Sequence, residues 1–169
     1  MEMDKLDNQV IINALKDKFG DAFTVLGEPH GLLTISVESE QIIAFLGFVK
    51  DDATLRLNYL TDITAVHYPK QEKDFCIVYH LHNMLHNMRL RIKVLVSGPT
   101  PTVPTATVLW NGANWMERET YDYFGVVFDG HPDLRRILNM DELEVFPMRK
   151  EYPLEDPNRV DKKDFYFGR

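Results

Sequence analysis

Two stretches near the N-terminus repeat their apolar residues every three to four positions, which is the period of an amphipathic helix. The first follows a candidate cap at positions 7–8 and stops at Gly20. Its apolar positions are Val10, Ile11, Ala14, Leu15 and Phe19. The second follows Ser39, a candidate cap, and ends at the aspartate pair 51–52. Its apolar positions are Ile42, Phe45, Leu46 and Val49. We therefore predict two helices in this region.

Alternation of apolar and polar residues predicts strands elsewhere in the N-terminal half. Residues 25–26 and 32–37, joined by "GEPHG", are predicted to form a hairpin. Residues 55–67 are predicted to form one strand, which Pro69 ends because proline cannot donate a ladder hydrogen bond. Six residues follow one continuous alternation along that strand: Leu55, Leu57, Tyr59, Ile63, Ala65 and His67.

The segment Phe75–Val96 is predicted to form a second hairpin, with its turn at Asn87 and Met88. The cross-strand pairs expected from that turn are Leu85 with Leu90, Leu81 with Val94, Tyr79 with Val96, His82 with Lys93, and His86 with Arg89. A slip by one residue would oppose apolar to charged positions, so we expect this register to be well determined.

The C-terminal third is predicted to hold two helical pieces and then a charged tail. A short piece around 108–110 precedes the break "NGAN". Asn114 and Glu117 are spaced as a capping box, which predicts a helix from Trp115 that ends at Gly125. The chain beyond Leu138 is rich in charge and proline, so we expect 139–169 to be extended and ordered against a partner.

Composition narrows the possible functions. A chain of 169 residues fits one domain, and its net charge of −7 argues against a general nucleic-acid binder. Cys76 is the only cysteine, so this chain alone cannot build a disulfide, a thiolate zinc site or an iron–sulfur cluster. The N-terminus does not resemble a signal peptide, and no apolar run reaches the length of about 18 residues that a membrane span needs. We expect a cytoplasmic protein that meets a membrane only through a partner.

Three kinds of site compete for the polar residues. His80, His82 and His86 share one strand face with Cys76 and could hold a metal, although the cations expected opposite them oppose this. Carboxylates 117, 119 and 122 could act in acid–base catalysis, but their position on a helix also explains them structurally. Arg135 and Arg136 lie among apolar residues, which favours a protein interface; an anion site is the rival, although no glycine-rich phosphate loop follows a strand.

At these residues the chain resembles a known family, that of the small hydrophilic C-type, or 30 kDa, subunit of proton-translocating NADH:quinone oxidoreductase (respiratory complex I). The resemblance rests on "ANWMERETYDYFGVVFDGHPDLRRIL", supported in order by "LTDITAVHYP", "FCIVYHLHNMLHNMRLRIKVLV", "VPTATVLW" and "FPMRKEYPLE". Three features depart from the family pattern: His67 after "DIT-V", the lack of Gly and His before the proline in "EVFPMRKEYP", and the ending "DKKDFYFGR".

The resemblance implies an α+β domain over residues 1–138, with two layers and a mixed, largely antiparallel sheet. Residues 139–169 would be an extended charged tail that docks on partner subunits. The partners implied are the large quinone-site subunit (of the D type) and cluster-bearing subunits of the peripheral arm, on the cytoplasmic face of the inner membrane. No cofactor is expected on this chain; iron–sulfur clusters, FMN and quinone would lie on other subunits.

The resemblance also implies a scaffold without catalytic, cofactor or metal residues. We expect its inter-subunit ion pairs to use Glu117, Arg118, Glu119, Asp122, His131, Arg135, Arg136, Arg149 and Lys150. Replacing the two adjacent arginines with alanine should then weaken assembly while the isolated domain stays folded. Three alternatives remain. One is the same kind of subunit in a membrane-bound hydrogenase or a dehydrogenase complex fed by ferredoxin or another donor. The others are a free-standing metal enzyme or hydrolase, and a generic acidic adaptor.

Overall fold

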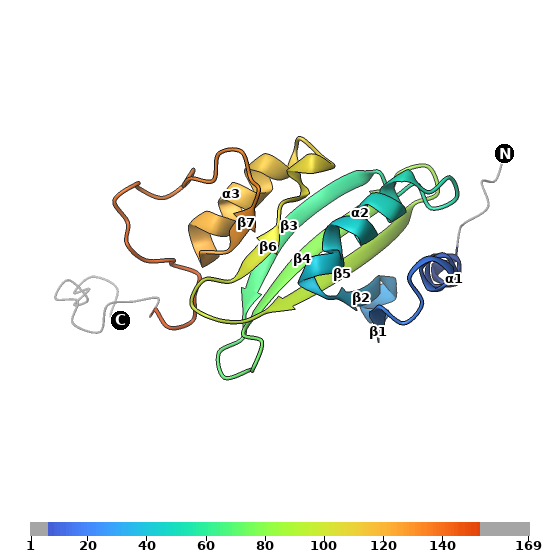
Figure 1. Ribbon diagram of the computed structural model, residues 1–169, viewed down its shortest axis with the longest axis horizontal. Coiled ribbons are helices and arrows are strands. Elements are labelled where there is room, and N and C mark those ends of the chain that lie inside the picture. Colours follow the sequence, from blue (N-terminus) through green and yellow to red (C-terminus); the bar gives the residue numbers. More distant parts are fainter. Residues whose placement is uncertain (1–6, 153–169) are drawn as a thin grey trace, which may run out of the picture.

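The computed structural model describes residues 7–152 and shows an α+β fold, as expected. Five strands form one sheet in the order β1-β2-β5-β4-β3 (Figure 1). The pair β2–β5 is parallel and the other neighbours are antiparallel, so the sheet is mixed and largely antiparallel. The fold class predicted above is therefore confirmed.

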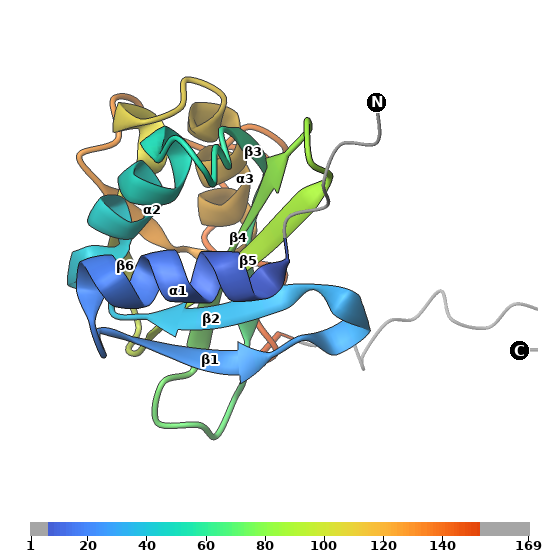
Figure 2. The ribbon, with the colours of Figure 1, turned by 90° about the vertical axis from the view of Figure 1, so that its right-hand side faces the viewer.

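The N-terminal elements follow the sequence prediction closely. Helix α1 (Asn8–Phe19) ends at Gly20, and strands β1 (Phe23–Gly27) and β2 (Leu33–Val37) form the antiparallel hairpin. Helix α2 (Ile42–Asp51) also lies where its apolar repeat placed it. Ser39 was wrong as its cap, because residues 39–41 form a separate 3-10 turn and Gln41 precedes the helix. Figure 2 shows α1 lying along β2.

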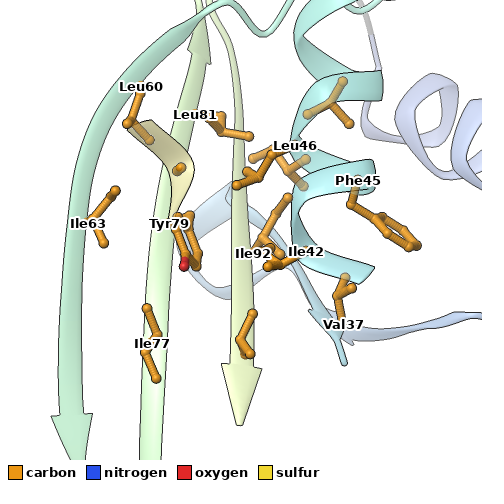
Figure 3. Close-up of a cluster of buried hydrophobic side chains, with 14 of the residues drawn as sticks. Val37, Ile42, Phe45, Leu46, Leu60, Ile63, Ile77, Tyr79, Leu81 and Ile92 are labelled. Atoms are coloured by element: carbon orange, nitrogen blue, oxygen red, sulfur yellow. The ribbon is translucent and has the colours of Figure 1, made fainter. Parts of the chain in front are cut away.

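The core lies between α2 and the sheet. Ile42 and Leu46 point from α2 toward Ile92 of β5, whereas Phe45 points to the other side of the helix (Figure 3). The Phe45 ring stacks on Phe19 of α1 with a centroid distance of 3.9 Å, which joins the two helices. Because side chains of a strand alternate between faces, this packing defines one helix-covered face of the sheet.

The strand predicted over 55–67 is shorter than expected. Strand β3 spans Tyr59–His67, and Leu55 and Leu57 are fully buried in a loop before it. The register with the neighbouring strand shifts between Leu60 and Asp62. This irregularity reverses the alternation, so Leu60 is buried and Tyr59 is 51% exposed. The continuous alternation predicted from Tyr59 to Ile63 was therefore wrong.

The second hairpin forms, but its register differs from the predicted one by four residues. Strand β4 (Phe75–Asn83) pairs with β5 (Met88–Val96), and Leu81 lies opposite Leu90. Residues 84–87 form the turn, where the Asn83 side chain accepts hydrogen bonds from the amides of Leu85 and His86. The pairs given for the predicted turn were thus wrong; His82 faces Arg89, and Lys93 faces Val78.

The remaining elements form a small unit beside β3. Strands β6 (Thr102–Pro104) and β7 (Val127–Asp129) pair in parallel. Between them lie a 3-10 turn (Ala106–Val108) and helix α3 (Ala113–Phe124). The short helical piece thus begins two residues before the predicted 108, and α3 begins two residues before the predicted Trp115. Within the described part of the chain, no helix or strand follows Asp129.

Candidate subunit interface

Helix α3 is held against the sheet edge by polar as well as apolar contacts. Its Thr120 hydroxyl donates to the carbonyl of Ile63 on β3 at 3.1 Å. Gly125 ends the helix in the left-handed conformation, with φ of 70°. The capping box proposed for its start was wrong, since Gly112 precedes the helix without a side-chain cap and Glu117 turns inward.

Glu117 is fully buried and is bound by residues that precede α3. The Thr105 hydroxyl donates to its Oε2 and the Ala106 amide donates to its Oε1, each at 2.6 Å. Burial raises the pKa of Glu117 to about 7, although these two hydrogen bonds act in the opposite direction. The Tyr79 hydroxyl is also buried, has no hydrogen-bond partner in the described structure, and has a raised pKa because of burial and the charge of Glu117.

His131 lies beside the same carboxylate. Its Nε2 is 4.0 Å from Oε2 of Glu117 and 3.2 Å from the carbonyl of Asn114. The amide of Asp133 donates to Nδ1 at 3.0 Å, so Nδ1 is an acceptor and the ring proton belongs on Nε2. This hydrogen bonding ties the loop after β7 to the start of α3.

Asp122, also fully buried, binds the loop that follows β7. Its Oδ2 accepts from the successive amides of Ile137, Leu138 and Asn139 at 3.1, 2.8 and 2.9 Å. Burial alone would raise the pKa of Asp122, but the hydrogen bonds from this loop and from the Arg136 and Asn139 side chains outweigh it and hold the pKa well below its ordinary value. The carboxylate is therefore ionised and structural.

Arg136 is the counter-charge of Asp122. Its Nη1 lies 2.7 Å from Oδ1 of that carboxylate, and its Nη2 donates to the carbonyls of Leu143 and Val145. The guanidinium also lies over the Phe146 ring. Arg118 is spaced i, i+4 from Asp122 but does not pair with it; it donates to the carbonyls of Arg135 and Arg136.

Arg149 joins the end of α3 to the rest of the domain. Its Nε donates to the carbonyl of Phe124 at 2.7 Å, and its Nη2 donates to the carbonyl of Pro99. Its guanidinium lies between the Phe75 and Phe146 rings, 5.0 and 4.8 Å from their centroids. Residues 139–152 therefore fold back on the domain's own helix. Residues 153–169 lie outside the described residues, and the domain boundary at 138 stays a prediction.

The nine predicted interface residues divide into two groups. Glu117, Arg118, Asp122, His131, Arg136 and Arg149 have partners inside this chain. Glu119, Arg135 and Lys150 are exposed, and Arg135 forms a surface ion pair with Asp133 at 3.0 Å. Five large apolar side chains from 108–148 are also exposed: Val108, Trp115, Leu138, Met140 and Met148. A hollow of about 550 Å³ lies beside Val108 and Trp115.

The histidine face has its own polar partners. His80 accepts from Arg91 Nε at 2.9 Å and lies 3.5 Å from Asp62, while His82 contacts Asn87. Burial and the Arg91 charge lower the pKa of His80. Among residues 7–152, no group of three or more His, Cys, Asp or Glu side chains is arranged to hold a metal ion.

Three partners of the charged cluster were missed from sequence. Thr105 binds Glu117 and Asn139 binds Asp122. The Phe146 ring lies under the guanidinium groups of Arg136 and Arg149. All three lie outside α3, so no spacing within the helix points to them; the "PTAT" and "RRILN" strings could have pointed to Thr105 and Asn139 only. None of the helices within 7–152 is long and apolar enough to cross a membrane.

Comparisons with known proteins agree with this arrangement. The family model "Respiratory-chain NADH dehydrogenase, 30 Kd subunit" matches residues 35–158. The C-type subunit of NADH-quinone oxidoreductase from Citrifermentans bemidjiense is 41% identical over 153 residues, covering 90% of this chain and 94% of that protein.

Solved structures show the same fold. The trypsin-resistant fragment (1-134) of Nqo5 superposes with a TM-score of 0.64 and 29% identity, covering 73% of this chain and 98% of the fragment. A chain of the membrane-bound sulfane sulfur reductase, an archaeal respiratory membrane complex, superposes with a TM-score of 0.71 and 24% identity, covering 86% and 85%; at that identity it shows the fold alone. This chain belongs to the family of the 30 kDa, or C-type, subunit of NADH-quinone oxidoreductase.

Proposed function

We propose that this chain is a non-catalytic structural subunit in the peripheral arm of a proton-translocating NADH:quinone oxidoreductase. In that role it holds the large, quinone-site subunit and so supports electron transfer from NADH to quinone. The observation that carries the proposal is the use of the buried charges: Asp122, Arg136 and Arg149 all bind backbone groups of their own chain. These hydrogen bonds fix the shape of the chain around the end of α3, so the three buried charges have structural roles.

The loop after β7, which is fixed in this way, and the start of α3, to which it is hydrogen-bonded, carry exposed apolar groups. Trp115 is 63% exposed, Leu138 59% and Met140 71%. Arg118 lies over the Trp115 ring at 5.0 Å, which holds the indole in place. Aromatic residues, Met and Arg are enriched where proteins meet, and burial of a large side chain contributes about 1.5–3 kcal/mol. This surface is therefore suited to burial by a neighbouring subunit.

Family membership supports the remaining parts of the proposal. The neighbours are the quinone-site subunit of the D type and cluster-bearing subunits, on the cytoplasmic face of the inner membrane. Iron–sulfur clusters, FMN and quinone belong to those neighbours, and this chain binds none of them. The exposed charges Glu119, Arg135 and Lys150 contribute ion pairs at the rim of the interface.

A second candidate is the equivalent subunit of a complex with another electron donor. The same fold occurs in a chain of the sulfane sulfur reductase complex, which is respiratory and membrane-bound yet is not named for NADH, so the fold alone does not identify the electron donor. The family match and the 41% identity to the Citrifermentans bemidjiense protein favour NADH-quinone oxidoreductase.

Purification from membranes tests the proposal. An affinity-tagged full chain, extracted in mild detergent, should bring cluster-bearing subunits with it, and Trp115→Ala should reduce their recovery about tenfold. Leu26→Ala, which truncates a 51% exposed side chain on β1, serves as the control and should leave recovery unchanged. Recovery of the chain alone, or turnover of a small molecule by the isolated chain, would contradict the proposal.

A further inference from the structure

A row of cations lies on the sheet face opposite the helices. Arg89, Arg91 and Lys93 alternate along β5 with Leu90 and Ile92, which are buried in the core. Because strand side chains alternate between faces, the three cations point away from α2. Neighbours in this basic row are about 7 Å apart along the strand, at roughly 3.4 Å per residue.

The strands beside the basic row supply little negative charge. The cross-strand partners on β4 are His82, His80 and Val78, and on the parallel neighbour β2 Thr34 and Ser36 lie opposite Arg91 and Lys93. Asp62 of β3 is the acid nearest to them in register, and it contacts His80. Among residues 7–152, no ion pair is formed by Arg89, Arg91 or Lys93.

The two guanidinium groups retain unused donors. Arg91 uses only its Nε, toward His80, and Arg89 makes no side-chain hydrogen bond to any residue in 7–152. Both line a hollow of about 410 Å³ together with Thr61, His80 and His82. A guanidinium presents paired N–H groups that match the two oxygens of a carboxylate, so this hollow is suited to a carboxylate side chain.

We propose that the basic row binds an acidic segment of a neighbouring subunit, whose Asp or Glu side chains insert between Arg89, Arg91 and Lys93. This inference rests on the proposed function and adds a second contact surface, on the face of the sheet away from the helices. Charge complementarity carries it, because three cations that lack acidic partners within 7–152 lie together in a chain with a net charge of −7.

The same cations are less suited to an anionic membrane. Polybasic membrane sites use about four to eight Lys and Arg residues, often on amphipathic helices. Here three cations lie on a strand, and Thr34, Ser36 and Asp62 are among their polar neighbours. The net negative charge of the chain also opposes approach to a negative surface.

Carbodiimide cross-linking of the intact complex tests the contact directly, because the reagent joins an amine to a carboxylate that touches it. We expect mass spectrometry to find Lys93 joined to an Asp or Glu of another subunit. Lys93→Arg keeps the charge but removes the amine, so this link should disappear while the complex remains assembled. Links from Lys93 to this chain alone would overturn the inference.

Charge reversal gives a second measurement. Arg89→Glu in the tagged full chain should lower recovery of partner subunits about tenfold. The control is Lys16→Glu, which makes the same charge change at an exposed position of α1. If both variants recover partners equally, the basic row does not bind them and the inference is wrong. If the unaltered chain recovers no partners, the proposed function itself fails.

Vesicles separate the membrane from a protein partner. The purified full chain should not bind phosphatidylcholine vesicles that contain phosphatidylglycerol. Binding to them that Arg89→Glu abolishes would assign the basic row to lipid and overturn the inference.

Discussion

The pKa values of the two buried carboxyl groups of α3 are shifted in opposite directions because their surroundings differ. Glu117 receives two neutral hydrogen bonds, and burial raises its pKa to about 7. Asp122 receives three backbone N–H groups and a guanidinium, so its pKa falls despite burial. On the same helix, the Glu117 carboxyl group therefore protonates near neutrality, whereas that of Asp122 remains ionised.

Glu117 should make stability depend on pH. A folded-state pKa of about 7, above the ordinary 4.5, means that its stabilising contribution is complete below pH 4.5 and is lost as the pH rises through 7. Between about pH 4.5 and 8, the chain should lose about 3 kcal/mol of unfolding free energy relative to Glu117→Gln. Urea unfolding of both proteins across this range measures the difference.

The control for this experiment is Glu119→Gln, since Glu119 is the exposed neighbour on the same helix. Its stability curve should run parallel to that of the unaltered chain. If the Glu117→Gln curve runs parallel as well, the carboxyl group does not titrate near neutrality in the folded protein.

At the scale of elements, periodicity predicted most positions in the fold but not every register. Helices α1 and α2 and the first hairpin lie where their apolar repeats placed them. The second hairpin kept its faces but shifted by four residues, because an even shift preserves the alternation of apolar and charged positions. The turn determines the register instead. The Asn83 side chain accepts hydrogen bonds from two turn amides, and Asn87 has a positive φ of 47°.

The contacts of the candidate site also could not be predicted from sequence periodicity. Sequence marked the charged residues of α3 and the following loop, but it could not show that most of them bind within the chain. Asp122 binds Asn139, which lies 17 residues later in the sequence, whereas Glu117 binds Thr105, which precedes α3. Such contacts depend on tertiary packing that no local period encodes.

The end of α3 yields a prediction at this scale. A Cβ at Gly125 would lie 2.5 Å from Arg149 Nη2 and from the Phe146 ring, at a φ of 70° that disfavours other residues. Gly125→Ala should therefore lower the unfolding free energy by about 2–5 kcal/mol, from backbone strain and displaced packing together. Urea unfolding of the full chain measures it.

Gly112→Ala is the matched control at the other end of the helix. Gly112 has a φ of −65° and no atom within 4 Å of the added carbon, so its substitution should change stability by less than about 1 kcal/mol. Equal effects of the two substitutions would show that the close approach at Gly125 does not cause the loss of unfolding free energy.

At the scale of the whole molecule, the adjacent arginines separate folding from assembly. Arg136 binds Asp122 and two loop carbonyls, so Arg136→Ala should lower the unfolding free energy by about 3–5 kcal/mol by leaving Asp122 buried without its counter-charge. This revises the sequence-based expectation that removing both arginines leaves the domain folded. Arg135 is 69% exposed, so Arg135→Ala should change stability by less than about 1 kcal/mol and weaken assembly only.

Urea unfolding of the isolated chain and native gels of the membrane complex measure the two effects. Loss of the complex with Arg136→Ala alone, at unchanged stability of the chain, would place that guanidinium at a partner and contradict its internal role.

The hydrogen bonds from three successive amides to Asp122 also affect how fast a neighbouring subunit could associate. A segment without helix or strand would ordinarily lose conformational entropy on docking, which slows productive encounters. Here residues 137–139 are already fixed by one carboxylate during folding. The loop thus meets its neighbour preorganised, and the encounter rate depends on diffusion and orientation instead of on a search among backbone conformations.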